Sequence, residues 1–179
     1  MQREKAEIMD EKAIQRAVAR ISYEIVERNH GVEGLCLIGI RRRGATLAKL
    51  IAAKLLEIEG AAVDTGFIDI TPYRDDHHGP ARGLPAGNPF GFDVEGRRVV
   101  LIDDVIFTGR SVRAAIEAVI RQGRPESLEL AVLIDRGHRE LPIRPDYIGK
   151  NVPTSRSESV DVMLSEYDGI NRVAIMEDL

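Results

Sequence analysis

The residue types that could carry chemistry concentrate between Val99 and Ser111, where the sequence reads Val-Val-Leu-Ile-Asp-Asp-Val-Ile-Phe-Thr-Gly-Arg-Ser. Four apolar residues end in two acids, Asp103 and Asp104, whose carboxylates can accept hydrogen bonds from a sugar diol. Thr108 to Ser111 then offers hydroxyls, a flexible glycine and successive backbone N–H groups before a predicted helix, an arrangement that binds anions. Diol acceptors and an anion cradle separated by one tight turn fit a ribose 5-phosphate.

Each half of this pattern has a simpler interpretation on its own. Asp103 and Asp104 could merely end a strand, and Thr108 could merely cap a helix. The whole pattern, placed on a strand, a turn and a helix in that order, favours a ligand site.

The elements around the segment predict an α/β fold. Asp10 is a plausible helix cap, and the chain then reads as helices and buried strands in alternation: helix to Asn29–Gly31, strand Leu35–Ile40, helix Ala45–Ile58, strand Val63–Ile70, strand Arg98–Asp103, helix Gly109–Gln122 and strand Leu128–Ile134. This order predicts an open, mainly parallel twisted sheet flanked by helices. Because ligands bind at the carboxyl ends of such strands, both acids are expected at that edge.

Two stretches depart from the alternation. Residues 71–92 contain four prolines and several glycines among Arg and Asp, so we expect a functional or mobile loop, in which His77 and His78 are plain loop residues. The tail reads as three short strands without intervening helices, at Tyr147–Val152, Ser159–Glu166 and Arg172–Glu177. We expect them to form a small antiparallel hood, partly from residues 136–179, within one domain spanning 1–179.

Composition limits the partners. The chain has 179 residues, 44% hydrophobic and 30% charged, and a net charge of −4, so bulk electrostatics would not hold nucleic acid and any RNA contact needs a local basic patch. The single cysteine, Cys36, lies in an apolar run and is expected to be a core residue. No signal-peptide pattern or run of about 20 apolar residues is present, which predicts a cytoplasmic protein.

The segment from Val99 to Ser111 resembles the signature of the type I phosphoribosyltransferases. The resemblance implies that Asp103 and Asp104 contact the ribose hydroxyls of 5-phosphoribosyl-1-pyrophosphate (PRPP) and are catalytic. It also implies that the 5-phosphate is bound by the residues that follow, Val105, Ile106, Phe107, Thr108, Gly109, Arg110 and Ser111. Mg²⁺ is expected as the cofactor, carried by the pyrophosphate of the donor rather than by direct protein ligands.

The leaving group needs a second anion site. Arg41, Arg42, Arg43 and Gly44 follow the first predicted strand and precede a helix, which suits pyrophosphate; a solvated basic turn is the alternative. Arg74, in the loop that could close over the donor and exclude water, is a candidate catalytic charge partner of the departing pyrophosphate. Exposed arginines on loops are more often solvated.

The stretch from Leu130 to Ser155 resembles the bifunctional pyrimidine-operon attenuation regulators that are also uracil phosphoribosyltransferases, and this likeness covers nearly the whole chain. It implies formation of UMP and pyrophosphate from uracil and PRPP, with Arg136 and Val160 at the base. It also implies binding of an mRNA leader hairpin with UMP or UTP as co-regulator. The basic residues available for RNA are Arg16, Arg20, Arg28, His138, Arg139, Arg144 and Lys150.

Other interpretations stay open. Arg16, Arg20 and Arg28 could form a solvated helix face, and a basic surface on an acidic chain could require a homo-dimer or higher homo-oligomer. The chain could act on guanine, hypoxanthine or orotate without an RNA role, or sense ligands without turnover. Ala19 and Tyr23 stand where the family usually has Thr and His.

Overall fold

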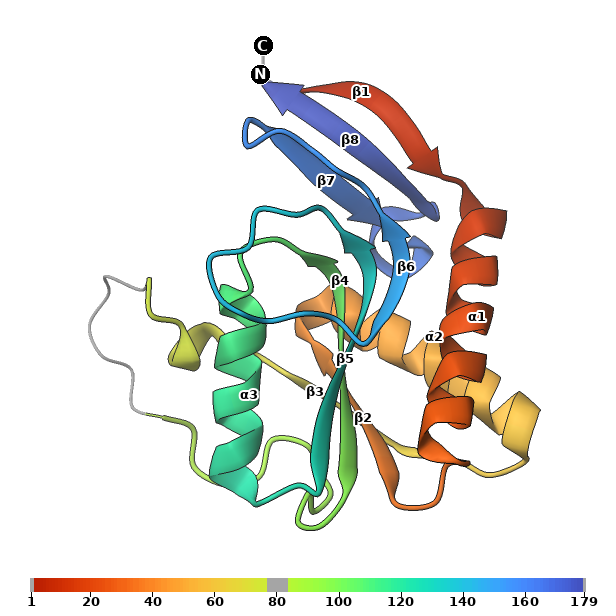
Figure 1. Ribbon diagram of the computed structural model, residues 1–179, viewed down its shortest axis with the longest axis vertical. Helices are drawn as coiled ribbons and strands as arrows, with labels where there is room; N and C mark the ends of the chain where they lie inside the picture. Colours follow the sequence, from red (N-terminus) through yellow and green to blue (C-terminus); the bar gives the residue numbers. More distant parts are fainter. Residues whose placement is uncertain (1, 77–83, 179) are drawn as a thin grey trace.

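A computed structural model describes residues 2–76 and 84–178 of the chain (Figure 1). Its main sheet has five parallel strands in the order β3-β2-β4-β5-β6. The strands are β2 (Leu35–Ile40), β3 (Asp64–Ile68), β4 (Arg98–Ile106), β5 (Ser127–Asp135) and β6 (Tyr147–Asn151). The predicted α/β class is therefore confirmed.

Helices cover both faces of this sheet. Figure 1 shows α1 (Glu11–Asn29) and α2 (Arg41–Glu59) on one side and α3 (Arg110–Gln122) on the other. Each side has its own apolar core, and the strand residues alternate between the two. All six residues of β2 are buried, as expected for a central parallel strand. Asp10 caps α1, as predicted, by accepting a 2.8 Å hydrogen bond from the backbone N–H of Ala13.

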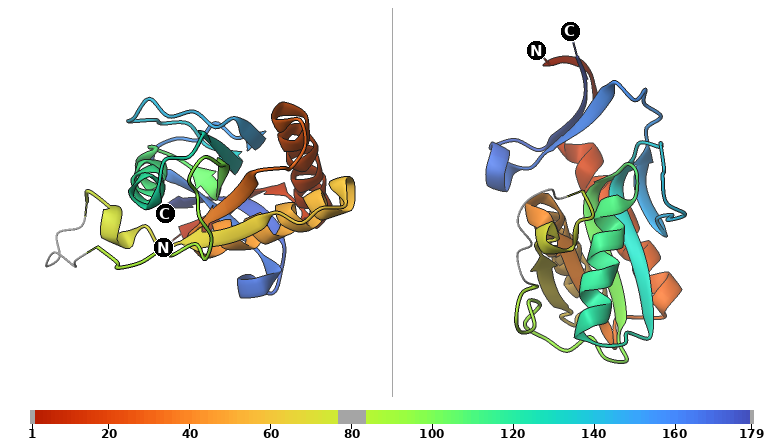
Figure 2. Two further views of the ribbon diagram at one scale, coloured as in Figure 1. Left: turned by 90° about the horizontal axis from the view of Figure 1, so that it is seen from below. Right: turned by 90° about the vertical axis from the view of Figure 1, so that its left-hand side faces the viewer.

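A second sheet of three antiparallel strands, the hood, lies beyond the carboxyl ends of the main strands (Figure 2). Its order is β1-β8-β7, formed by β1 (Gln2–Met9), β7 (Glu158–Met163) and β8 (Arg172–Asp178), with the one-turn helix α4 (Ser165–Asp168) between the last two. The predicted antiparallel hood is confirmed in outline.

Three details of the prediction were wrong. β6 pairs in parallel with β5 and extends the main sheet instead of the hood. β1 was not predicted, because half of its residues are charged and only its last residue is buried. The tail also contains a helical turn, α4, where only strands were expected.

Two boundaries near the predicted site also differ. β4 continues past Asp103 and Asp104 to Ile106, because Val105 and Ile106 keep pairing with β5. The helix predicted from Ala45 begins at Arg41, so residues 41–44 form its first turn rather than a preceding loop.

Described parts of the predicted loop, residues 71–76 and 84–92, include a short helix that packs on α3. Thr71–Tyr73 forms a short 3-10 helix, and Arg113 of α3 donates a 2.7 Å hydrogen bond to the backbone oxygen of Tyr73. Tyr73 and Phe90 are both buried. His77 and His78 lie outside the described residues. No helix within the described ranges is long and apolar enough to cross a membrane.

Candidate functional site

The two acids predicted from the sequence lie near the carboxyl end of β4, where the sheet meets the hood. Asp103 is only 5% exposed and Asp104 is half-buried. One oxygen of Asp103 accepts the backbone N–H of Asp104 at 2.9 Å, and one oxygen of Asp104 accepts that of Val105 at 2.9 Å. Burial, and after it the charge of Asp104, raises the pKa of Asp103 well above its ordinary value, and Arg41 opposes this rise.

The cradle, which we define as Val105–Ser111, follows directly and leads into α3. Gly109 has φ 93°, a left-handed conformation that glycine adopts without steric cost, and α3 starts at the next residue without a side-chain cap. Thr108 Oγ1 accepts the backbone N–H of Arg110 at 3.3 Å. The first turn of α3 therefore presents backbone donors and the positive end of the helix dipole at this point.

A pocket of about 350 Å³ opens at the cradle. Its lining brings together Asp103, all seven residues of the cradle, and Arg74 from the loop after β3. The full set is Arg74, Asp76, Asp103, Val105, Ile106, Phe107, Thr108, Gly109, Arg110, Ser111, Val112 and Glu140. Arg74 donates to Asp76 from Nε at 2.7 Å. One of the two predicted diol acceptors, Asp103, thus lines the same cavity as the anion cradle and the loop arginine, while Asp104 is not part of its lining.

The turn between β2 and α2 is unusually tight. Arg41 has a left-handed backbone with φ 59°, so strand and helix join without a connecting residue. A Cβ on Gly44 would lie 2.6 Å from the backbone oxygen of Ile102, and one on Gly39 would lie 2.5 Å from the Cα of Ala45. Only glycine fits at either position, because both contacts are with backbone atoms.

The predicted pyrophosphate residues do not all face the same place. Arg41 and Arg42 line a separate pocket of about 560 Å³ beside α4, although the charge of Arg41 reaches Asp103. Arg43 instead pairs with Asp168 of α4, with 3.1 Å between Nη2 and Oδ1. Arg43 therefore ties α2 to the segment after β7, a role that its sequence position did not indicate.

Arg136, predicted to lie beside the base, is 7% exposed and ties the hood to the cradle. Its guanidinium stacks 3.9 Å from the ring centroid of Phe107. Nε donates to Thr154 Oγ1 at 3.0 Å, and Nη2 donates to the backbone oxygens of Ser155 and Glu158 at 3.1 and 2.5 Å. Burial lowers the pKa of this guanidinium. Val160, the other predicted base residue, is half-buried on β7.

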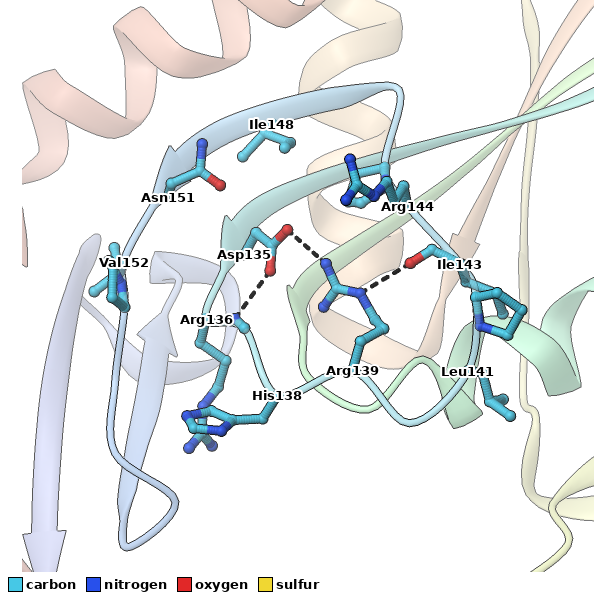
Figure 3. Close-up of a pocket in the computed structure, with 14 residues that line it drawn as sticks. Asp135, Arg136, His138, Arg139, Leu141, Ile143, Arg144, Ile148, Asn151 and Val152 are labelled. Carbon is cyan, nitrogen blue, oxygen red and sulfur yellow. Dashed lines mark hydrogen bonds and ion pairs between the residues drawn. The ribbon is translucent and has the colours of Figure 1, made fainter.

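A larger pocket of about 820 Å³ lies under the crossover loop, residues 136–146 between β5 and β6 (Figure 3). Three predicted RNA residues, His138, Arg139 and Arg144, line it. Arg139 donates to the backbone oxygens of Ile143 and Phe107 and pairs with Asp135 at 2.6 Å, so the loop is braced from within.

The other predicted RNA residues follow α1 and β6. Arg16 is exposed, and Arg20 donates to the backbone oxygens of Ile148 and Gly149 of β6. Arg28 pairs with Asp146 at 2.9 Å and Lys150 donates to the backbone oxygen of Ile8 at 3.1 Å. Most of these cations therefore also hold α1, β6 and β1 together.

Glu140 was missed by sequence reasoning. It lies in the crossover loop, yet it lines the 350 Å³ pocket and pairs with Arg110 at 2.8 Å. A single exposed glutamate among loop residues gives no sequence signal, because its partner is 30 positions away. Among residues 2–76 and 84–178, no three His, Cys, Asp or Glu side chains are grouped to hold a metal ion.

Comparison with known proteins places these features in a family. Residues 4–166 match the family described as "Phosphoribosyl transferase domain". The chain is 57% identical over 175 residues to the "Bifunctional protein PyrR" of Acetivibrio thermocellus, covering 97% of this chain and 95% of that protein. It is also 57% identical over 178 residues to the protein of the same name from Clostridioides difficile, covering 97% and 99%.

Solved structures support the same fold. A hypoxanthine phosphoribosyltransferase from Trypanosoma cruzi, solved in a ternary complex with substrates, superposes with a TM-score of 0.76 at 20% identity, covering 97% of this chain and 96% of that one. The corresponding enzyme from Staphylococcus aureus gives a TM-score of 0.71 at 18% identity, covering 97% and 92%. At such identities the likeness concerns the fold alone.

Proposed function

This chain belongs to the phosphoribosyltransferase family, among the proteins named bifunctional PyrR, and from that premise we propose two linked activities. The first is transfer of the phosphoribosyl group of PRPP to uracil, which gives UMP and pyrophosphate. The second is binding of an RNA hairpin in the leader of pyrimidine-synthesis mRNA, with UMP or UTP as co-regulator. The observation that carries the proposal is the convergence of Asp103, the cradle and Arg74 on one pocket in a chain so similar to those relatives.

In this proposal, the groups of the donor are matched to the residues around the pocket by their chemistry. The helix start and backbone N–H groups of the cradle suit the 5-phosphate, and the carboxylates of Asp103 and Asp104 suit the ribose hydroxyls. Arg74 then lies where it can offset the charge of the departing pyrophosphate, with Arg41 at the neighbouring turn. In the reaction, the bond from the anomeric carbon to pyrophosphate breaks, a bond to N1 of uracil forms, and the N1 proton is released.

Mg²⁺ is part of the proposal as a companion of the donor. The described residues offer no three-ligand protein site, but Asp103 and Asp104 give a carboxylate-rich edge that tolerates a cation held by pyrophosphate. Such an ion would neutralise charge on the leaving group. The chain's own contribution is to orient the ribose and keep water from the anomeric carbon.

The first experiment offers purified protein PRPP, Mg²⁺ and a panel of uracil, orotate, guanine and hypoxanthine. We expect UMP from uracil alone, and no product from the double variant Asp103→Asn, Asp104→Asn. Product from a purine or from orotate, with uracil inert, would favour the alternative function, a phosphoribosyltransferase for another base. PRPP binding without any product would favour a sensor that has lost turnover.

The second experiment measures binding of the leader hairpin with and without UMP at several salt concentrations. We expect UMP to tighten binding and salt to weaken it, because phosphate contacts release counterions. The basic residues around the 820 Å³ pocket and along α1 and β6 support this role. Equal affinity for unrelated hairpins, without nucleotide dependence, would argue against an attenuator. A homo-oligomer would extend the basic surface, and light scattering can measure whether the chain forms one.

A further inference from the structure

The cradle already contains a carboxylate. Arg110, the first residue of α3, donates from Nε to Glu140 Oε2 at 2.8 Å and from Nη1 to Asp75 Oδ2 at 2.8 Å. Glu140 reaches the cradle from the crossover loop and forms part of the wall of the 350 Å³ pocket. Without a ligand, the cation at this helix start is therefore neutralised by the protein itself.

A ligand phosphate would compete with Glu140 for the same place. A phosphate monoester carries a charge of about −1.5 to −2 at neutral pH and accepts paired hydrogen bonds from arginine more strongly than a single carboxylate oxygen does. Arg110 already pairs with two carboxylates, and a phosphate would be a third anion at the same guanidinium, repelled by both. Of the two carboxylates, Glu140 lines the pocket and Asp75 does not, so Glu140 is the one that the phosphate meets. The side chains of Arg110 and Glu140 are each 42% exposed, so Glu140 can turn into solvent when phosphate arrives.

The backbone of Glu140 is attached to the cradle as well. The N–H groups of Glu140 and Leu141 donate to the backbone oxygen of Thr108 at 3.0 and 3.2 Å, and Arg139 Nη1 donates to that of Phe107 at 2.9 Å. A change in the partner of Arg110 therefore acts on a segment that is joined to the cradle at several points. That same segment carries the basic side chains around the larger pocket (Figure 3).

We propose that Glu140 is the resident counter-anion of the cradle, that the phosphate of a bound nucleotide displaces it from Arg110, and that this exchange repositions the crossover loop for RNA. The inference rests on the proposed function, since it supplies the physical link between UMP and hairpin binding. It treats the Arg110–Glu140 pair as an element with two states that both ligands bias, as linked binding requires.

The test uses Glu140→Gln, which removes the charge and keeps the shape, in the full chain. The matched control is Glu57→Gln, whose carboxylate pairs with Lys54 on α2, away from both pockets. Calorimetry gives the Kd for UMP without RNA, and filter binding gives the Kd for the leader hairpin with and without saturating UMP.

In Glu140→Gln we expect UMP to bind about threefold to tenfold more tightly, the scale of one nearby charge. Hairpin binding without UMP should tighten towards its UMP-saturated value, so the ratio of the two hairpin Kd values falls towards 1. Glu57→Gln should leave both quantities as in the wild type. An unchanged UMP affinity would overturn the displacement of Glu140.

A general electrostatic effect gives a different result. If removing the charge tightens hairpin binding equally with and without UMP, the ratio stays constant and the proposed link to RNA is overturned. If UMP does not affect hairpin binding in the wild type, the attenuator function itself fails. The UMP arm, measured without RNA, then still decides whether Glu140 competes with phosphate.

Discussion

At the scale of single residues, Asp103 places a carboxyl group where its ionised form costs stability. It is 5% exposed beside Asp104, and burial raises its pKa in the folded protein. The folded state then binds the proton more tightly than the unfolded chain. The stability contribution of Asp103 is therefore complete at pH values below the unfolded pKa and is lost as pH rises through the folded pKa.

Replacing Asp103 with Asn should separate these two effects. Asn keeps the oxygen that accepts the N–H of Asp104 and removes the buried charge, so we expect the free energy of unfolding at pH 7 to stay equal or rise by about 1 kcal/mol. Urea denaturation measures this, and the gain should vanish near pH 4, where Asp is ordinarily half-protonated. UMP formation should fall by roughly 100-fold. A marked loss of stability at pH 7, absent from the exposed control Asp161→Asn, would contradict this account.

Arg136→Lys tests a second single residue. Lysine keeps the positive charge but cannot stack as a plane on Phe107 while donating to Thr154, Ser155 and Glu158. We expect the free energy of unfolding to fall by about 1–3 kcal/mol, because three acceptors around the guanidinium of Arg136, a residue only 7% exposed, lose their donors. Chemical denaturation provides the measurement, and an unchanged midpoint would show that the stacked guanidinium contributes little.

At the scale of elements, the join between β2 and α2 depends on close backbone packing. Gly44→Ala should lower the free energy of unfolding by about 1–3 kcal/mol, since its Cβ would lie 2.6 Å from the backbone oxygen of Ile102. This is opposite to the helix preference of alanine, which is favoured over glycine by about 1 kcal/mol. Ala53→Gly, at an exposed position of α2, is the control for that preference. Stabilisation by Gly44→Ala would mean that the first turn of α2 can move away from β4.

The elements that sequence analysis predicted well are those with a strong local pattern. The apolar runs of β2, β4 and β5 and the spacing of α1 and α3 depend on residues that lie close together in the chain. The acids and the cradle were located for the same reason, since strand, turn and helix occupy one short segment. That Asp103 and the cradle meet Arg74 at one pocket depends on the tertiary structure. From the sequence, only the rule that ligands bind at the carboxyl ends of parallel strands pointed to it.

The predictions that failed depend on distant partners. β1, which was missed, is a strand because β8 pairs with it; β6 was predicted as a strand, but it joins the main sheet instead of the hood because it pairs with β5. Local hydrophobic periodicity does not reveal either pairing, since half of the residues of β1 are charged and β6 has only five residues. Glu140 was missed similarly, because its role exists only where the crossover loop meets α3. Predicted roles for Arg136 and Val160 at the base stay predictions.

At the scale of the whole molecule, charge has to be distributed unevenly for RNA to bind. The net charge is −4, while Arg144 is exposed beside the 820 Å³ pocket. Arg144→Gln should weaken hairpin binding and reduce the slope of log affinity against log salt by roughly 1, as expected for one lost phosphate contact. Filter binding across a salt series measures both. Arg121→Gln, on α3 across the sheet from α1, should leave the slope unchanged; a change there would mean that binding is not local.

The pairing of β1 with β8 has a consequence for the protein while it is being made. β1 leaves the ribosome long before its partner strand β8, because the two are separated by residues 10–171. At synthesis rates of roughly 5–20 residues per second, β1 waits on the order of ten seconds with no strand to pair with. An unpaired apolar strand would be prone to aggregate during that interval. In β1 the charged residues Arg3, Glu4, Lys5 and Glu7 disfavour pairing with strands of other chains. The charges that made β1 hard to predict from the sequence therefore also protect it from aggregation until β8 has been synthesised.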